Sequence, residues 1–200
     1  MTLLRQSRVQ QTAADSPRKI PGEEGIWVFV LGDMMVFALF FATFMYSRGK
    51  NRAVFASDHT ELHVALGTIN TVLLLLSSLL VVLAVQRVLA GRRAGAWRLV
   101  AAAMSCGAGF IVVKAVEWTQ LFAADKGVGS GEYFSYYFMF TGIHLLHVVI
   151  GLAVLGRLIV VIRQTEFADK QARLCETGGI FWHMVDLLWV VLFALFYLVR

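Results

Sequence analysis

The sequence is poor in the residues that build disulfide-linked or zinc-binding proteins, since it has only two cysteines in 200 residues. Cys106 and Cys175 lie far apart and form no CxxC motif, so they predict neither a disulfide framework nor a zinc site. The metalloprotease motif HExxH is also absent. Charged residues make up only 16%, and the basic ones lie in short clusters between apolar runs. This arrangement is typical of membrane loops and argues against a nucleic-acid-binding groove.

Internal symmetry and long polar segments are missing too. No internal repeat and no Gly/Pro-broken apolar run is visible, although both are common in transporters. The connections between apolar runs are short, so no soluble catalytic domain is expected. Residues 1–20 are polar and basic and lack an apolar core segment, so we expect a flexible cytoplasmic tail there and no cleavable signal peptide.

Apolar residues are what the chain has in excess. The hydrophobic fraction is 58% and the mean hydropathy is +0.71, whereas soluble domains have roughly 45–50% apolar residues. Five stretches reach the length of about 20 residues that a bilayer core requires, at 25–46, 62–85, 99–122, 133–156 and 178–199. The fourth is expected to continue past Arg157 to about Ile162. Residues 21–200 are therefore predicted to form a single all-α, polytopic membrane helix bundle with five transmembrane helices.

The distribution of Lys and Arg predicts the orientation. The N-terminal tail, the second connection and the fourth connection contain twelve of these residues, against five in the first and third connections and at the C-terminus. The positive-inside rule then places the N-terminus in the cytoplasm and the C-terminus outside. Aromatic residues near the span ends, including Tyr137, Trp182 and Tyr197, are predicted to lie in interfacial belts.

Ionisable residues within the predicted spans are the candidate functional residues. A charged residue at a helix centre costs about 2.5 kcal/mol or more in a membrane. The residues are Asp33, Lys114, Glu117, His144, His147, His183 and Asp186. Three pairs among them have i,i+3 spacing, which places the members of each pair on one helix face.

Their expected depths predict two polar groups. Counting about 1.5 Å per residue along each span, we expect an outer group of Lys114, Glu117 and His144. An inner group would contain Asp33, His183 and Asp186, with His147 between the two groups.

Three interpretations of these residues are considered. The three histidines with a carboxylate would satisfy the ligand count of a Zn, Cu or non-haem Fe site. A chain of carboxylates and histidines could relay protons. The favoured interpretation is a buried polar network that binds helices together, because the expected depths differ and HxxH is a weak motif.

Small residues in the spans are expected at helix contacts rather than in a ligand site. They are Asn70, Thr71, Ser77, Ser78, Gly107, Gly109, Gly151 and Gly156.

Two C-terminal motifs resemble a known family. Residues 141–151 read TGIHLLHVVIG, which resembles the TGxHxxHVxxG signature of subunit III of the haem–copper oxidases. Residues 182–189 read WHMVDLLW, similar to the family's WHFVDxxW. The chain resembles a five-helix form of this family. The opening of its first span, residues 21–34, is most similar to the NorE-type branch associated with bacterial nitric oxide reductase.

The resemblance implies a subunit without cofactors or catalytic residues of its own, in the bacterial inner membrane. Haem and metal are then expected in a catalytic partner subunit, which this chain would stabilise while binding membrane phospholipid. The seven ionisable residues would hold helices and lipid headgroups in place. The lead hypothesis is an accessory subunit of nitric oxide reductase or a terminal oxidase. The alternative is subunit III of a cytochrome c or quinol oxidase, supporting proton uptake. A small transporter or proton conductor working alone is the alternative from another class.

Overall fold

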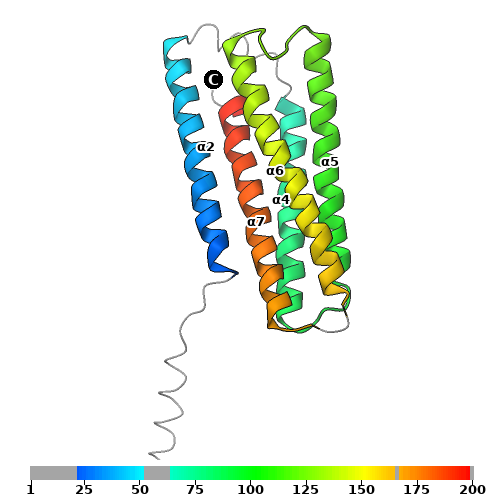
Figure 1. The fold of residues 1–200 in the computed structure, drawn as a ribbon. Coiled ribbons are helices and arrows are strands. Elements are labelled where there is room, and N and C mark those ends of the chain that lie inside the picture. Colours follow the sequence, from blue (N-terminus) through cyan, green and yellow to red (C-terminus); the bar gives the residue numbers. More distant parts are fainter. Residues whose placement is uncertain (1–21, 52–63, 165–166, 199–200) are drawn as a thin grey trace, which may run out of the picture.

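The computed structural model describes residues 22–51, 64–164 and 167–198, and every regular element in these ranges is helical (Figure 1). The elements are α2 (Glu24–Lys50), α4 (Val64–Leu89), α5 (Ala96–Ala123), α6 (Glu132–Ile162), α7 (Asp169–Phe193) and the π-helix η1 (Ala194–Leu198). The tail predicted for residues 1–20 lies outside the described residues.

Within the described ranges five helices are long and apolar enough to cross a membrane, as the sequence predicted. The shortest α-helix has 25 residues and the longest has 31. At 1.5 Å per residue these lengths correspond to about 38–47 Å, more than the roughly 30 Å of a hydrocarbon core. The fourth span does continue through Arg157 and ends at Ile162.

The last helix begins earlier than its apolar stretch. The sequence predicted a start at residue 178, but α7 begins at Asp169, where the backbone N–H of Ala168 donates to Oε1 of Gln171 at 3.0 Å. A hydropathy profile identifies only the lipid-facing part of a helix. The helix itself can extend further, because its backbone hydrogen bonds also form between polar residues that lie in water. The first turns of α7 are such a polar extension.

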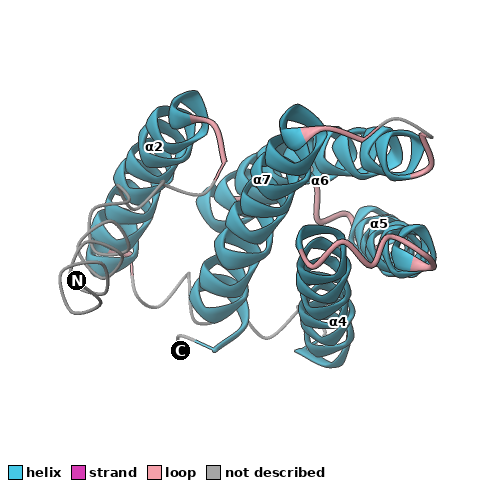
Figure 2. Ribbon diagram, turned by 90° about the horizontal axis from the view of Figure 1, so that it is seen from below, coloured by secondary structure: helices cyan, strands magenta, loops and turns pink. Residues whose placement is uncertain are grey.

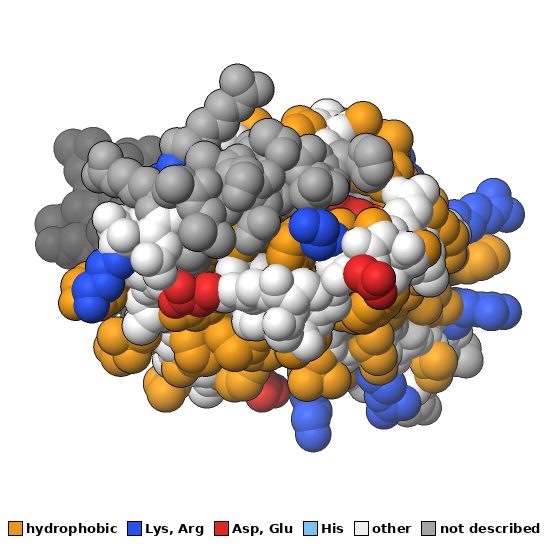
Figure 3. All heavy atoms as spheres, turned by 90° about the horizontal axis from the view of Figure 1, so that it is seen from above, with side chains coloured by type: hydrophobic (Ala, Val, Ile, Leu, Met, Phe, Trp, Pro, Cys, Tyr) orange, Lys and Arg blue, Asp and Glu red, His pale blue; other side chains and the backbone are white. Residues whose placement is uncertain are grey.

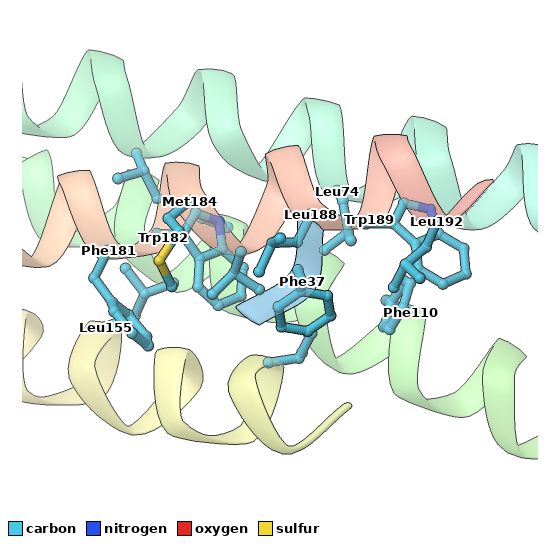
Figure 4. Packing of buried hydrophobic residues seen from close by; sticks show 14 of the residues in the cluster. Phe37, Leu74, Phe110, Leu155, Phe181, Trp182, Met184, Leu188, Trp189 and Leu192 are labelled. Atoms are coloured by element: carbon cyan, nitrogen blue, oxygen red, sulfur yellow. The ribbon is translucent and has the colours of Figure 1, made fainter. Parts of the chain in front are cut away.

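Helix α7 forms the centre of the bundle. It packs against α4 on one side and α6 on another, and α5 packs against both α4 and α6 (Figure 2). Trp182 and Trp189 project from α7 into the core and are 0% exposed (Figure 4). The indole Nε1 of Trp182 donates to Ser77 at 3.1 Å, and that of Trp189 donates to Thr71 at 3.1 Å. The prediction that Thr71 and Ser77 lie at helix contacts is confirmed.

Two glycines allow the helices to approach the ring of Trp182. A Cβ atom at Gly151 on α6 would lie 2.6 Å from Cε3 of this ring, and one at Gly107 on α5 would lie 3.0 Å from Cη2. Gly109 and Gly156 do not have this role, because a Cβ there would lie 3.5 Å and 3.7 Å from its nearest neighbour, which is ordinary contact. The close approach predicted for all four glycines is therefore confirmed at two of them.

Helix α2 lies at the edge of the bundle (Figure 1). Among its described side chains only Phe37, Phe44 and Ser47 are buried. Aromatic rings bridge the distance to the neighbouring helices, with 4.9 Å between the ring centroids of Phe44 and Phe196. The helix therefore contributes little buried surface of its own.

Polar contacts hold both ends of α2. At its start, the N–H of Glu23 donates to Oγ1 of Thr177 on α7 at 3.0 Å. At its end, Ser47 donates to the carboxylate of Glu132 on α6, and Nδ2 of Asn51 donates to the same carboxylate at 3.0 Å. These contacts fix the height of α2 along the bundle.

The outer surface of the bundle is mainly apolar. Viewed along the helices, hydrophobic side chains form much of the outline, while Lys and Arg side chains project at its margin (Figure 3). Exposed residues such as Leu39 (63%) and Leu146 (58%) suit contact with lipid.

Candidate functional site

A buried polar cluster surrounds Lys114 on α5. Its Nζ lies 2.9 Å from Oε2 of Glu117, 2.8 Å from Oη of Tyr137 and 3.0 Å from Oη of Tyr197. The hydroxyl of Tyr197 donates to Oε1 of Glu117 at 2.5 Å. All four side chains are buried, and Lys114 and Glu117 are each 1% exposed. We call these four residues the Lys114 cluster.

Three helical elements meet in the Lys114 cluster. Lys114 and Glu117 lie one turn apart on α5, Tyr137 belongs to α6 and Tyr197 belongs to η1. The sequence predicted the Lys114–Glu117 pair but assigned both tyrosines to interfacial belts. That assignment was wrong, because Tyr137 is 0% and Tyr197 3% exposed. Trp182, predicted in the belt at the other end of the last span, is likewise buried.

The Lys114 cluster is a closed network. An ammonium group has three donors, and each finds an acceptor here. The paired carboxylate receives a further hydrogen bond, so both charges have partners in a setting where an unpaired charge is very costly. Such a network holds α5, α6 and η1 together.

Asp33 on α2 pairs with His147 on α6. Nε2 of His147 lies 3.2 Å from Oδ1 of Asp33, and Nδ1 lies 2.9 Å from the carbonyl oxygen of Ile143. The two side chains are 13% and 14% exposed. This contact is a third attachment of α2, between the contacts at its two ends.

His183 and Asp186 form a separate pair on α7. Nδ1 of His183 lies 2.7 Å from Oγ of Ser78 on α4 and 3.6 Å from Oδ2 of Asp186. The carboxylate is buried, at 4% exposure, whereas the imidazole is 37% exposed. Ser78 lies at a helix contact, as predicted.

His144 lies alone among aromatic rings. It is 0% exposed, with ring centroids of Phe110 at 5.6 Å and Trp189 at 5.4 Å. Neither ring nitrogen has a hydrogen-bond partner among the described residues. Its position packs α6 against α5 and α7.

The structure groups the seven residues differently from the predicted inner and outer groups. Asp33 contacts His147 rather than His183 or Asp186, because α2 packs its Asp33 face toward α6. His144 makes no hydrogen bond to Lys114 or Glu117, which the two tyrosines complete instead. Within the ranges that the structure describes, no three His, Cys, Asp or Glu side chains form a group suited to a metal ion.

The family model and three relatives that match this chain all carry the name of an oxidase subunit III or 3. The family model described as cytochrome c oxidase subunit III matches residues 19–199. Subunit 3 of cytochrome bo(3) ubiquinol oxidase from Pseudomonas putida is 29% identical over 87% of this chain and 84% of its own length. A probable cytochrome c oxidase subunit 3 from Nocardia farcinica is 28% identical over 88% and 87%. A haem-copper oxidase subunit I+III from Aeropyrum pernix is 28% identical over 87% of this chain and 22% of its own length.

Proposed function

The chain belongs to the cytochrome c oxidase subunit III family, and from this membership we propose that it is a non-catalytic accessory subunit of a terminal haem–copper oxidase. The observation that carries the proposal is the family match over residues 19–199, nearly the whole chain. The proposed location is a bacterial inner membrane, with the N-terminus in the cytoplasm as the distribution of Lys and Arg favours.

The relatives support a catalytic oxidase subunit as the partner. Two of them are named as subunit 3 of a ubiquinol oxidase or a cytochrome c oxidase. A third is named as subunit I+III, so in that relative the homologous segment belongs to the same polypeptide as subunit I. Haem and metal are proposed to reside in this partner.

The arrangement of the ionisable residues supports a non-catalytic role. Six of the seven predicted residues lie in three separate pairs, and His144 is enclosed by aromatic rings. The pair Asp33–His147 joins α2 to α6, and the two pairs within single helices reach neighbouring elements through Tyr137, Tyr197 and Ser78, so the residues stabilise the bundle that the partner would bind. Stabilisation of the catalytic subunit follows from a rigid bundle, and it requires no chemistry in this chain.

Nitric oxide reductase is the second candidate partner. It rests on residues 21–34, whose sequence is most similar to the NorE-type branch. The relatives named above are oxidase subunits, so the oxidase is placed first.

A cleft near the start of α2 supports phospholipid binding. It has a volume of about 220 Å³ and lies between the ends of α2, α6 and α7. Its lining is Glu23, Arg157, Val161, Gln164, Lys170, Gln171 and Leu174. Two cations against one carboxylate leave the lining with a net positive charge, and with two amides and the apolar side chains it suits an anionic headgroup and its first acyl carbons. We propose this cleft as the headgroup site.

Replacing both cations of the cleft is expected to release lipid. The double variant Arg157→Gln/Lys170→Gln should retain less anionic phospholipid after detergent purification, because about 1 kcal/mol of attraction is lost per cation. Phospholipid per chain can be measured by mass spectrometry. The control Arg87→Gln/Arg92→Gln removes the same charge from two residues that do not line the cleft. Equal lipid loss in both variants would assign the effect to net charge alone.

Affinity purification tests the proposed function. A tag on this chain, expressed in cells that contain the whole respiratory complex, should co-purify a haem-containing oxidase subunit identified by mass spectrometry. A nitric oxide reductase subunit in its place would favour the second candidate. Stoichiometric haem, copper or iron in the chain after separation from its partner would refute the non-catalytic role. Proton or solute flux in liposomes that contain only this chain would favour the stand-alone transporter.

A further inference from the structure

His183 differs from the other ionisable residues of the spans in its exposure. Its side chain is 37% exposed, whereas Asp33 and His147 are 14% and 13% exposed and Lys114 and Glu117 are 1% exposed. His183 follows Thr177, which contacts the start of α2, by about 9 Å along the helix. It therefore presents a polar ring on the outer surface of the bundle at membrane depth.

Neighbouring groups hold the His183 ring in one orientation. Nδ1 lies 2.7 Å from the Ser78 hydroxyl and 3.6 Å from the Asp186 carboxylate, so this edge of the ring faces the protein. Neither oxygen of Asp186 has a hydrogen-bond partner within the described ranges, although the residue is only 4% exposed. Nε2, on the opposite edge, has no hydrogen-bond partner among the described residues, so it is available to a group from another molecule.

The surface around His183 is an apolar strip along α7 and α4. Leu187 and Val190, one and two turns further along α7, are 51% and 37% exposed. Leu75, one turn before Ser78 on α4, is 52% exposed. Figure 2 shows α2 and α4 flanking α7, with α6 on a third side. We call Leu75, His183, Leu187 and Val190 the His183 strip.

Lipid alone is a poor covering for the His183 strip. A polar group that faces hydrocarbon without a hydrogen bond costs several kcal/mol in free energy, and ionisable residues in membrane helices almost always face protein or water. Exposed residues elsewhere on the bundle, such as Leu39 on α2 and Leu146 on α6, are apolar and suit lipid. A polar group from a neighbouring protein would satisfy Nε2 and bury the leucines.

We propose that the His183 strip is the surface that binds the catalytic subunit, through a transmembrane helix with a hydrogen-bonding side chain opposite Nε2 of His183. This inference rests on the proposed function, because it takes the partner to be the haem-containing subunit. The buried Asp186 carboxylate and Ser78 position the ring, and Leu75, Leu187 and Val190 provide the apolar contact.

Site-specific crosslinking tests the position of this surface. A photoreactive amino acid is placed at Leu75 or Leu187 in the strip and at Leu39 or Leu146 as controls with similar exposure. The strip positions should crosslink to the haem subunit in the intact complex, and the controls should not. The proposal would be overturned if only the control positions crosslinked to the haem subunit. It would also be overturned if the strip positions crosslinked only to lipid or to a second copy of this chain.

Substitution of His183 tests the hydrogen bond. His183→Leu should lower the amount of haem subunit retained on a tagged chain by about 3- to 15-fold, the range expected for one interhelical hydrogen bond in a membrane. His183→Gln keeps a donor and should retain the partner within about twofold. Thermal unfolding of each variant without the partner shows whether the chain itself is folded. Equal retention by both variants would overturn the role of Nε2.

The two proposals fail in different ways. If no haem protein co-purifies with the wild-type chain, the proposed function fails and the crosslinks have no partner to report. If the haem protein co-purifies but crosslinks only from Leu39 or Leu146, the proposed function stands and the docking surface is wrong.

Discussion

Replacing Lys114 with methionine is expected to lower the free energy of unfolding by about 3–5 kcal/mol. The change leaves the Glu117 carboxylate, 1% exposed, without its counter-ion in a low-dielectric interior. It also removes the group that joins Tyr137 and Tyr197 to α5. Unfolding of the purified chain by SDS in mixed micelles, followed by circular dichroism, measures the loss.

A double-mutant cycle separates the ion pair from simple packing. Lys114→Met combined with Glu117→Met removes both charges, so the double variant should lose less stability than the sum of the two single variants. Tyr197→Phe removes one hydroxyl and should cost about 1–3 kcal/mol. Additive losses in the cycle would show that Lys114 and Glu117 are not energetically coupled.

The second large effect is expected at Gly151. Its replacement by alanine would place a Cβ 2.6 Å from the buried Trp182 ring, so α6 and α7 must separate or the ring must shift. Overpacking of this kind costs about 1–3 kcal/mol. The same SDS titration measures the change.

Gly156 provides a control on the same helix. A Cβ at Gly156 would lie 3.7 Å from Cε of Met104, within ordinary contact distance. Since alanine favours a helix over glycine by about 0.8–1 kcal/mol, Gly156→Ala should leave stability unchanged or raise it. If both alanine variants were equally stable, the close approach at Trp182 would have no energetic importance.

Most of the fold could be predicted from the sequence, because lipid selects long apolar helices. Five spans follow from length and hydropathy alone. Two features could not be predicted in this way. The polar first turns of α7 look like a loop by hydropathy, and the π-helix Ala194–Leu198 has no distinct sequence pattern. Both depend on hydrogen bonds rather than on apolarity.

The candidate site could be predicted only in part. Spacing predicted the Lys114–Glu117 contact, because i,i+3 neighbours share a helix face. Spacing could not show which helix supplies the remaining partners. Leu195, Phe196 and Tyr197 in η1 are all buried, and Tyr197 reaches the Glu117 carboxylate from this element. The π-helix thereby brings Tyr197 to Glu117, and only coordinates reveal this contact.

The weak burial of α2 has a consequence for biosynthesis. Among the described spans α2 is synthesised first, yet its partners Glu132, His147 and Thr177 belong to the last two of them, α6 and α7. At about 5–20 residues per second, His147 follows Asp33 after an interval on the order of ten seconds. During this interval the Asp33 carboxyl lies in or near the membrane without its contact to His147. Of the described spans, α2 is therefore made first but completes its polar contacts last, after α6 and α7 have been synthesised. These contacts then determine the position of α2 against the bundle.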